Sequence, residues 1–414
     1  MGTILLYIDP GTGSMLLAAI LGILTTVAFA ARGLLLKLKF FFQGGKAHAE
    51  EKKTAELVLF SDHRRYTSTF RPVLRELEKR KVKARFLTAS KDDPLLSESF
   101  SGITTEFIGE GNLAWARLNK LQAKVVLSTT PGLSVYQWKR SKGVKTYVHI
   151  LHAVGSALGY RMFGLDFYDA VLTGGPVHEK EIRELEELRG LPKKELCSVG
   201  CPYLDELKTR YDEVKKREPQ RKTEGNVTVL LAPSWGRSAL LSLYGGRLIR
   251  ALLETGFDLI IRPHPQSLIT EKEIVEPLMK EFPESEHLAW DLSDDNFPAL
   301  LKADLMVTDF SGVIFDFCLV FDKPILYAED VFDPAPYDAA WVDHPLWKYE
   351  ILPKLGIPLK EDDLGRMKEL INTALHEERY ALGRKEARES VWSNPGLGAK
   401  GTAKALVDFL RQEG

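Results

Sequence analysis

Short apolar segments alternate with amphipathic segments along most of this chain. In the first half, six apolar runs predict buried strands, at residues 57–60, 84–87, 105–108, 124–127, 146–151 and 170–173. Helical spacing of apolar residues follows the first run, from Thr67 to Arg80, and Pro176 opens another helix after the last run. Strands that are apolar throughout and alternate with helices predict a parallel sheet covered on both faces.

A second series of the same kind follows a charged break. Residues 208–225 are dense in Lys, Arg and Glu, which predicts a solvated helix and a linker. Strands are then predicted at 227–231, 257–261, 303–307 and 324–327, and helices at 240–253, 271–282, 313–321, 363–375 and 402–411. The predicted fold class is α/β, with two doubly wound, Rossmann-like parallel-sheet domains at 54–215 and 226–390 that face each other across a cleft. A C-terminal helix follows within 391–414.

The N-terminus departs from this alternation. Residues 14–31 carry no charge and are mostly apolar, a length at the lower end of what spans a bilayer. Basic residues follow the run, at positions Arg32, Lys37, Lys39, Lys46, Lys52 and Lys53. The positive-inside bias therefore predicts a transmembrane helix within residues 1–45, a single-pass anchor in the inner (plasma) membrane with both domains cytoplasmic. A secretory signal would need positive charge before the run, and a buried or interfacial hairpin stays open as the alternative.

Composition excludes several classes of function. With 44% hydrophobic and 27% charged residues, the chain of 414 residues is a folded globular protein of two or three domains. A net charge of -1 gives no basic field for a nucleic acid partner. Three cysteines, Cys197, Cys201 and Cys318, fit a reducing compartment, and no second pair completes a zinc site, so we predict no metal.

Candidate chemistry gathers where predicted strands end. Arg262-Pro263-His264-Pro265 follows an apolar strand, and the prolines stiffen the backbone around the imidazole. A fixed cation and imidazole at a strand end suit a pyrophosphate or a leaving phosphate. Thr308-Asp309 ends another strand, and Ser311-Gly312 opens the next helix, whose free N–H groups suit phosphate. We expect Arg262, His264 and Ser311 to form one phosphate site on neighbouring strand ends.

Two further strand ends supply candidates. After residue 231, Ser234 and Arg237 are candidate phosphate contacts, and Trp235 is a candidate base-stacking residue, unless the segment is only a turn with a packed Trp. In the first half, His152 ends a strand before small residues, where a base for an acceptor hydroxyl belongs. His149 lies inside that strand and is interpreted as structural, and His178 is interpreted as a surface residue.

These stretches, in this order, resemble the CDP-glycerol glycerophosphotransferase family of teichoic-acid primases and polymerases. The matching residues are the His152 loop, Ala232-Pro233-Ser234-Trp235, Arg262-Pro263-His264-Pro265, Thr308-Asp309-Phe310-Ser311, Phe315-Asp316 and Asp322-Lys323-Pro324. The resemblance implies a GT-B fold, no metal or cofactor, a CDP- or otherwise nucleotide-activated donor, and a lipid-linked or polymer acceptor. It assigns His152 as the base, His264 to the donor pyrophosphate and Ser311 to phosphate.

The chain also departs from the family's usual pattern. His152-Ala153-Val154 stands where the family usually has His-Gly-Thr, and Ser311-Gly312 stands where it usually has two serines. Two alternatives therefore stay open. One is a UDP-sugar transferase or 2-epimerase-like enzyme on the same fold, with Asp309 as a candidate acidic catalyst. The other is an inactive scaffold for envelope assembly.

Overall fold

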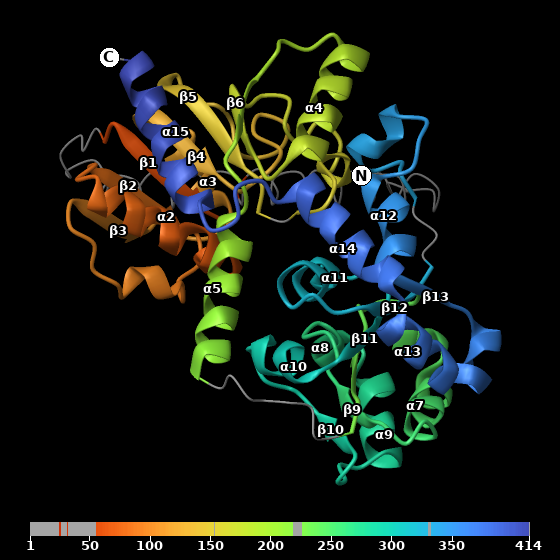
Figure 1. Cartoon of the computed structure of the whole chain (residues 1–414). Coiled ribbons are helices and arrows are strands. Elements are labelled where there is room, and N and C mark those ends of the chain that lie inside the picture. Colours follow the sequence, from red (N-terminus) through yellow and green to blue (C-terminus); the bar gives the residue numbers. More distant parts are fainter. Residues whose placement is uncertain are drawn as a thin grey trace, which may run out of the picture. The chain divides into compact units, whose positions relative to one another are not determined.

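Two parallel β-sheets, formed one after the other along the chain, make up the fold (Figure 1). The computed structural model describes residues 55–152, 154–217, 226–329 and 333–413, together with Thr25 and Ala31. Apart from Thr25 and Ala31, the predicted membrane segment lies outside these described residues. Within them, no helix combines the length and the apolar character that crossing a membrane requires.

The first sheet has seven strands in the order β3-β2-β1-β4-β5-β6-β7, and every pair is parallel. The strands are β1 (Leu57–Ser61), β2 (Ala84–Thr88), β3 (Ile103–Phe107), β4 (Gln122–Ser128), β5 (Gly143–Ile150), β6 (Ala170–Thr173) and β7 (Glu195–Ser198). The second sheet has six strands in the order β10-β9-β8-β11-β12-β13, again all parallel. They are β8 (Thr228–Ala232), β9 (Asp258–Ile261), β10 (Leu288–Trp290), β11 (Leu305–Thr308), β12 (Ile325–Ala328) and β13 (Gly356–Leu359).

Helices connect the strands and cover both faces of each sheet. In the first half they are α2 (Thr67–Lys79), α3 (Asn112–Leu118), α4 (Pro176–Arg189) and α5 (Pro202–Arg217). In the second half they are α6 (Leu240–Leu243), α7 (Gly245–Leu253), α8 (Ser267–Thr270), α9 (Lys272–Glu281), α10 (Phe297–Lys302), α11 (Val313–Phe315), α12 (Trp347–Leu355), α13 (Met367–His376), α14 (Glu378–Val391) and α15 (Gly398–Gln412).

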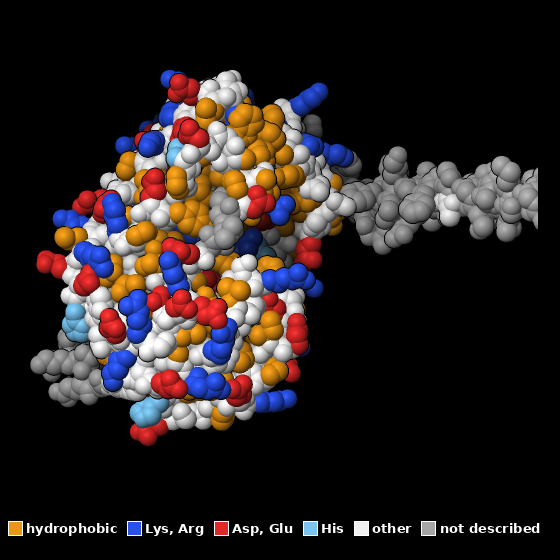
Figure 2. Space-filling model, turned by 90° about the vertical axis from the view of Figure 1, so that its right-hand side faces the viewer, with side chains coloured by type: hydrophobic (Ala, Val, Ile, Leu, Met, Phe, Trp, Pro, Cys, Tyr) orange, Lys and Arg blue, Asp and Glu red, His pale blue; other side chains and the backbone are white. Residues whose placement is uncertain are grey.

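Alternation of side chains along each strand divides the core into layers. In β1, Leu57 and Leu59 pack with α2 and α15, whereas Val58 and Phe60 pack with α3 on the other face. The second sheet is covered in the same way, by α7, α9 and α13 on one face and by α10, α12 and α14 on the other. On the face that Figure 2 shows, side chains of both charge signs are interspersed with apolar ones.

The end of the chain returns from the second sheet to the first. Helix α14 packs on α12, and α15 then lies against α2 and β4 (Figure 1). The carboxylate of Asp205, on α5, fixes this return. It accepts hydrogen bonds from Trp392 Nε1 at 2.9 Å and from the backbone N–H groups of Gly396 and Gly398, both at 2.7 Å.

The sequence predicted most of these elements but missed three strands at the edges of the sheets and several helices. The predicted runs coincide with β1, β2, β3, β4, β5 and β6 and with β8, β9, β11 and β12, with ends shifted by a few residues. Strands β7, β10 and β13 are only three or four residues long and were not predicted, nor were α3, α8, α10, α12 and α14. The helix predicted at 313–321 is one α-turn followed by a π-helix, Asp316–Val320. Short edge strands carry too few apolar residues to show a period.

We expect Asp205→Ala to lower the free energy of unfolding by about 3 kcal/mol, because three donors lose one shared acceptor. Urea denaturation of the full chain in detergent measures this. Asp212→Ala is the matched control on the same helix, because among the described residues its carboxylate pairs only with the half-exposed Lys208. Equal losses in the two variants would show that the return does not depend on Asp205.

Candidate functional site

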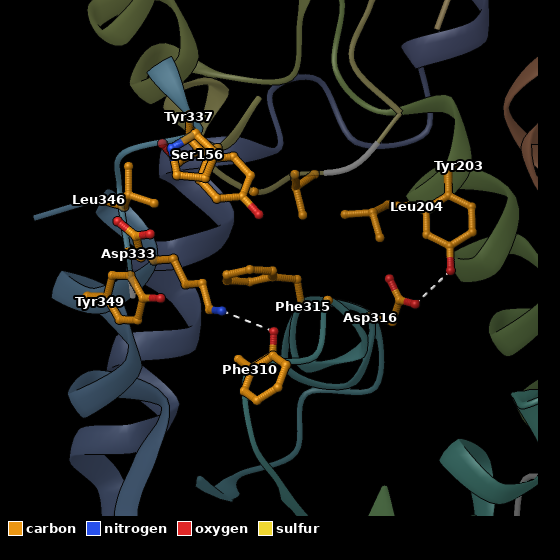
Figure 3. Close-up of a pocket in the computed structure, with 16 residues that line it drawn as sticks. Ser156, Tyr203, Leu204, Phe310, Phe315, Asp316, Asp333, Tyr337, Leu346 and Tyr349 are labelled. Atoms are coloured by element: carbon orange, nitrogen blue, oxygen red, sulfur yellow. Dashed lines mark hydrogen bonds between the residues drawn. The ribbon is translucent and has the colours of Figure 1, made fainter. Parts of the chain in front are cut away.

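A cavity of about 610 Å³ lies beside the carboxyl end of the second sheet (Figure 3). Its walls come from four stretches of chain: the loop after β5, the start of α5, the loop after β11 and the segment 333–349. The lining residues discussed below are Gly155, Ser156, Gly159, Tyr203, Phe310, Gly312, Asp316 and Lys348. Both predicted domains therefore contribute to one cavity, as expected for facing nucleotide folds.

Two hydrogen bonds define opposite parts of this cavity. The Tyr203 hydroxyl donates to Asp316 Oδ2 at 2.6 Å, which joins α5 to the helix after β11 (Figure 3). Burial raises the pKa of Asp316 to about 7. Elsewhere in the cavity, Lys348 Nζ donates to the Phe310 carbonyl at 3.0 Å. An ammonium group at the edge of a helix start adds positive charge where a phosphate would sit.

Of the four residues predicted at the end of β11, Thr308 and Asp309 face inward and Gly312 faces the cavity. Thr308 Oγ1 donates to the Ala232 carbonyl at 2.7 Å. The buried Asp309 carboxylate accepts from the N–H groups of Ser234 at 2.9 Å and Leu240 at 3.1 Å. These two residues therefore hold the loop after β8 in place. Gly312 is exposed and lines the cavity, and Ser311 is partly exposed beside it.

Arg262 and His264 follow β9, and the sheet order separates them from Ser311. Strand β8 lies between β9 and β11, so the expectation of neighbouring strand ends is wrong. The Arg262 guanidinium is bound to Asp291 at 2.5 Å and to the Ser293 carbonyl at 2.7 Å. His264 is half-buried, its Nδ1 accepts from the Gln266 N–H at 3.1 Å, and burial lowers its pKa.

The loop after β8 fills the position between these strand ends. Ser234 in this loop is buried, and the ring of Trp235 is half-exposed with its centroid 6.4 Å from that of His264. Arg237 is exposed and, among the residues that the structure describes, has no ion-pair partner. Trp235 and His264 therefore lie side by side, Arg237 is exposed two residues after Trp235, and Ser234 is held by Asp309.

His152 lies in a second cavity, of about 500 Å³, at the carboxyl end of the first sheet. Its ring contacts Tyr66, with 4.8 Å between centroids, and its Nδ1 is 3.4 Å from the Tyr160 hydroxyl. That hydroxyl is also 2.9 Å from Nε2 of the buried His149. Burial, together with the nearby positive charge of Arg65, lowers the pKa of His152 to about 4. The imidazole is therefore neutral at pH 7, as a proton acceptor must be.

The loop that follows His152 is common to both cavities. Gly155, Ser156 and Gly159 line each of them. Glu181 on α4 accepts from Ser156 Oγ and from the Ala157 N–H, both at 2.6 Å. His178, one turn earlier, donates from Nε2 to the Gly155 carbonyl at 3.0 Å.

The interpretation of His178 as a surface residue is wrong. Its side chain is fully buried, its Nδ1 accepts from the Gly175 N–H at 3.1 Å, and burial lowers its pKa to about 4. The proline at the start of α4 suggested an exposed first turn, but that turn packs under the loop. Glu181, Tyr160 and Tyr203 were also missed, because their roles depend on contacts between distant parts of the chain.

Comparison of the sequence with known families gives one match. Residues 46–341 match the family described as CDP-Glycerol:Poly(glycerophosphate) glycerophosphotransferase, which covers more than half of the chain. No curated protein matches the sequence.

Solved structures show which folds are similar. The wall teichoic acid polymerase TagF superposes with a TM-score of 0.56 at 12% identity, over 95% of this chain and 98% of that one. The UDP-GlcNAc 2-epimerase of Methanocaldococcus jannaschii gives 0.53 at 13% identity, over 85% and 99%. That of Neisseria meningitidis gives 0.52 at 13% identity, over 86% and 99%. At such identities these likenesses show the fold alone, which is GT-B-like.

The family match and the residues that carry it lead to one conclusion. The strand-end motifs after β5, β8, β9 and β11 all lie within the matched residues. The chain belongs to the CDP-glycerol:poly(glycerophosphate) glycerophosphotransferase family and is a transferase.

Proposed function

We propose that this transferase moves a glycerophosphate-like group from a CDP-activated donor to a hydroxyl of a lipid-linked or polymeric acceptor in the cell envelope. The observation that carries the proposal is the wall common to the two cavities. Gly155, Ser156 and Gly159 line both, so a donor beside Gly312 and an acceptor beside His152 would meet across this loop.

The chemistry assigns one task to each cavity. His152 takes the proton of the acceptor hydroxyl, whose oxygen attacks the β-phosphorus of the donor. The bond from that phosphorus to the bridging oxygen breaks, and CMP leaves. Backbone N–H groups near Ser311 and Gly312 and the ammonium of Lys348 favour the negative charge of the diphosphate. His264 serves the donor pyrophosphate, with Arg237 as a further phosphate contact and Trp235 stacked on the base.

A UDP-sugar-dependent activity is the second candidate, because two 2-epimerases superpose on the chain. Its candidate acidic catalyst, Asp309, is 1% exposed and already accepts hydrogen bonds from Ser234 and Leu240. Because these hydrogen bonds already engage the carboxylate that would serve as the acidic catalyst, they favour glycerophosphate transfer over the UDP-sugar-dependent activity. An inactive scaffold is the third candidate, motivated by the altered residues after His152. Screening the protein with CDP-glycerol and with UDP-GlcNAc separates the three, with release of CMP or UDP and conversion of UDP-GlcNAc to its 2-epimer as the readouts, because epimerisation leaves the sugar bonded to UDP.

Substitution of the two histidines should produce different kinetic defects. His152→Ala should lower kcat by roughly two to four powers of ten and leave the Kd for CDP unchanged, because a base acts in the transition state. His264→Ala should weaken CDP binding as well. Steady-state kinetics and calorimetric titration with CDP measure the two effects.

The exposed His376 provides the control, since His376→Gln should change neither constant. Wild-type turnover by His152→Ala would remove this residue from the mechanism, and the fold assignment would survive that result.

The pH profile should report the low pKa of the base. Because the pKa of His152 is lowered to about 4, its imidazole stays neutral as the pH falls from 7 to 5. As the pH is lowered, we expect kcat/KM to fall near pH 4 and not near the ordinary histidine value of about 6.5. Circular dichroism over the same range checks that the protein stays folded. An acid limb near 6.5 in folded protein would contradict the burial of this imidazole.

We also propose that residues within 1–45 anchor the chain in the inner membrane, with the catalytic domains cytoplasmic. The uncharged run at 14–31 and the basic residues after it support this. A chain starting at Lys53 should partition into the soluble fraction and bind CDP like the full chain. Recovery in the membrane fraction, or loss of CDP binding by folded protein, would refute the division.

A further inference from the structure

Three polar side chains stand in a row at the cavity of His152, and the proposed mechanism uses only one of them. The Tyr160 hydroxyl lies between two imidazoles, 2.9 Å from Nε2 of His149 and 3.4 Å from Nδ1 of His152. His149 is fully buried in β5, and its Nδ1 has no hydrogen-bond partner among the residues that the structure describes. Tyr160 and His152 both line the cavity. One hydroxyl therefore joins the proposed base to a buried histidine.

All three groups are neutral at pH 7. Burial lowers the pKa of His149 well below its ordinary value and lowers that of His152 to about 4, whereas burial raises the pKa of Tyr160. A neutral imidazole has one nitrogen that donates and one that accepts, and a neutral hydroxyl has one proton. Tyr160 can therefore donate to only one of its two neighbours.

The direction of that donation decides whether His152 can act as a base. If the hydroxyl donates to His149, its oxygen accepts from Nδ1–H of His152, and Nε2 of His152 keeps a lone pair. If the hydroxyl donates to His152, that ring carries its proton on Nε2 and has no nitrogen left to take another. The contact with His149 is the shorter of the two, as expected where a hydroxyl donates, which favours the first direction.

We propose that Tyr160 is a positioning residue that holds the proton of His152 on Nδ1 and so leaves Nε2 free to take the proton of the acceptor hydroxyl. His149 completes the row by accepting from Tyr160. The inference rests on the proposed function, in which His152 is the base, and it adds two residues and a defined tautomer. A base that is oriented by a third group is the general arrangement in such sites.

The main chain of Tyr160 is held by a segment from the second half of the protein. The Tyr160 carbonyl accepts from the Asp338 N–H at 2.8 Å, and the Met162 N–H donates to the Pro336 carbonyl at 3.1 Å. The side chain of Tyr160 therefore starts from a fixed backbone, which a residue that orients another side chain requires.

NMR of the full chain in detergent, with 15N-labelled histidine, reads the tautomer directly. At pH 7, a ring nitrogen that carries a proton and one that carries a lone pair have distinct chemical shifts, and His152→Gln identifies the signals of this ring. The wild type should show a protonated Nδ1 and an unprotonated Nε2. Tyr160→Phe should shift the proton toward Nε2, because the acceptor for Nδ1–H is gone.

Kinetics should show the same dependence. With CMP release from CDP-glycerol as the readout, Tyr160→Phe should lower kcat by about tenfold to a hundredfold. The Kd for CDP should stay unchanged, because the hydroxyl acts on the base and not on the nucleotide.

Tyr147→Phe is the matched control. Tyr147 is buried two residues before His149 on the same strand, and its hydroxyl accepts from the Ser141 N–H at 2.9 Å, away from the residues that line the cavity. The variant loses a buried hydroxyl without touching the row, so it should change neither the tautomer of His152 nor kcat.

Two results would overturn the proposal. One is a wild-type His152 with its proton on Nε2, held by the Thr129 carbonyl, which also hydrogen-bonds this ring. The other is a tautomer that folded Tyr160→Phe leaves unchanged. The wild-type spectrum decides the question even if Tyr160→Phe unfolds. Wild-type turnover by His152→Ala would instead count against the proposed function, so the two failures are distinguishable.

Discussion

A buried carboxylate and a buried imidazole on one helix hold the loop on which both cavities depend. Glu181 and His178 lie one turn apart on α4 and bind three consecutive residues, Gly155, Ser156 and Ala157. Burial raises the pKa of Glu181 to about 6 and lowers that of His178 to about 4. Such groups are costly to bury unless hydrogen-bonded, so the native loop conformation satisfies them and alternative conformations do not.

The fixed loop has a functional consequence because it belongs to both cavities. A transferase must keep donor and acceptor apart until each is bound and then bring the reacting atoms into contact. Small residues at Gly155 and Gly159 leave room on both sides of the backbone, and Ser156 is held through its hydroxyl by Glu181. The Tyr203–Asp316 hydrogen bond joins the two halves beside the cavity that Gly312 lines. Buried polar contacts therefore fix the loop that separates the two cavities.

The sequence revealed the alternation of strands and helices, the two-sheet organisation and the strand ends that carry His152, His264 and Gly312. It could not separate residues that hold the fold from residues that face a ligand. Lys323, within the resemblance to the family, caps α10 by donating to the carbonyls of Leu300, Leu301 and Ala303. Asp309 holds the loop after β8 in the same structural sense. Strand order, which put β8 between β9 and β11, also depends on tertiary pairing that local patterns do not encode.

Whether a polar atom is paired distinguishes these two kinds of residue. Arg262 looked like a free cation in the sequence, yet Asp291 and Ser293 occupy its guanidinium. Arg65 attracted no attention in the sequence, yet it lines the cavity of His152 and forms no ion pair with any described carboxylate. A net charge of -1 is a sum over the whole chain and does not distinguish cations that form ion pairs from cations that do not. Because pairing cancels the field of a charge at close range, an anionic ligand responds to the unpaired cations near its site and not to the composition of the chain.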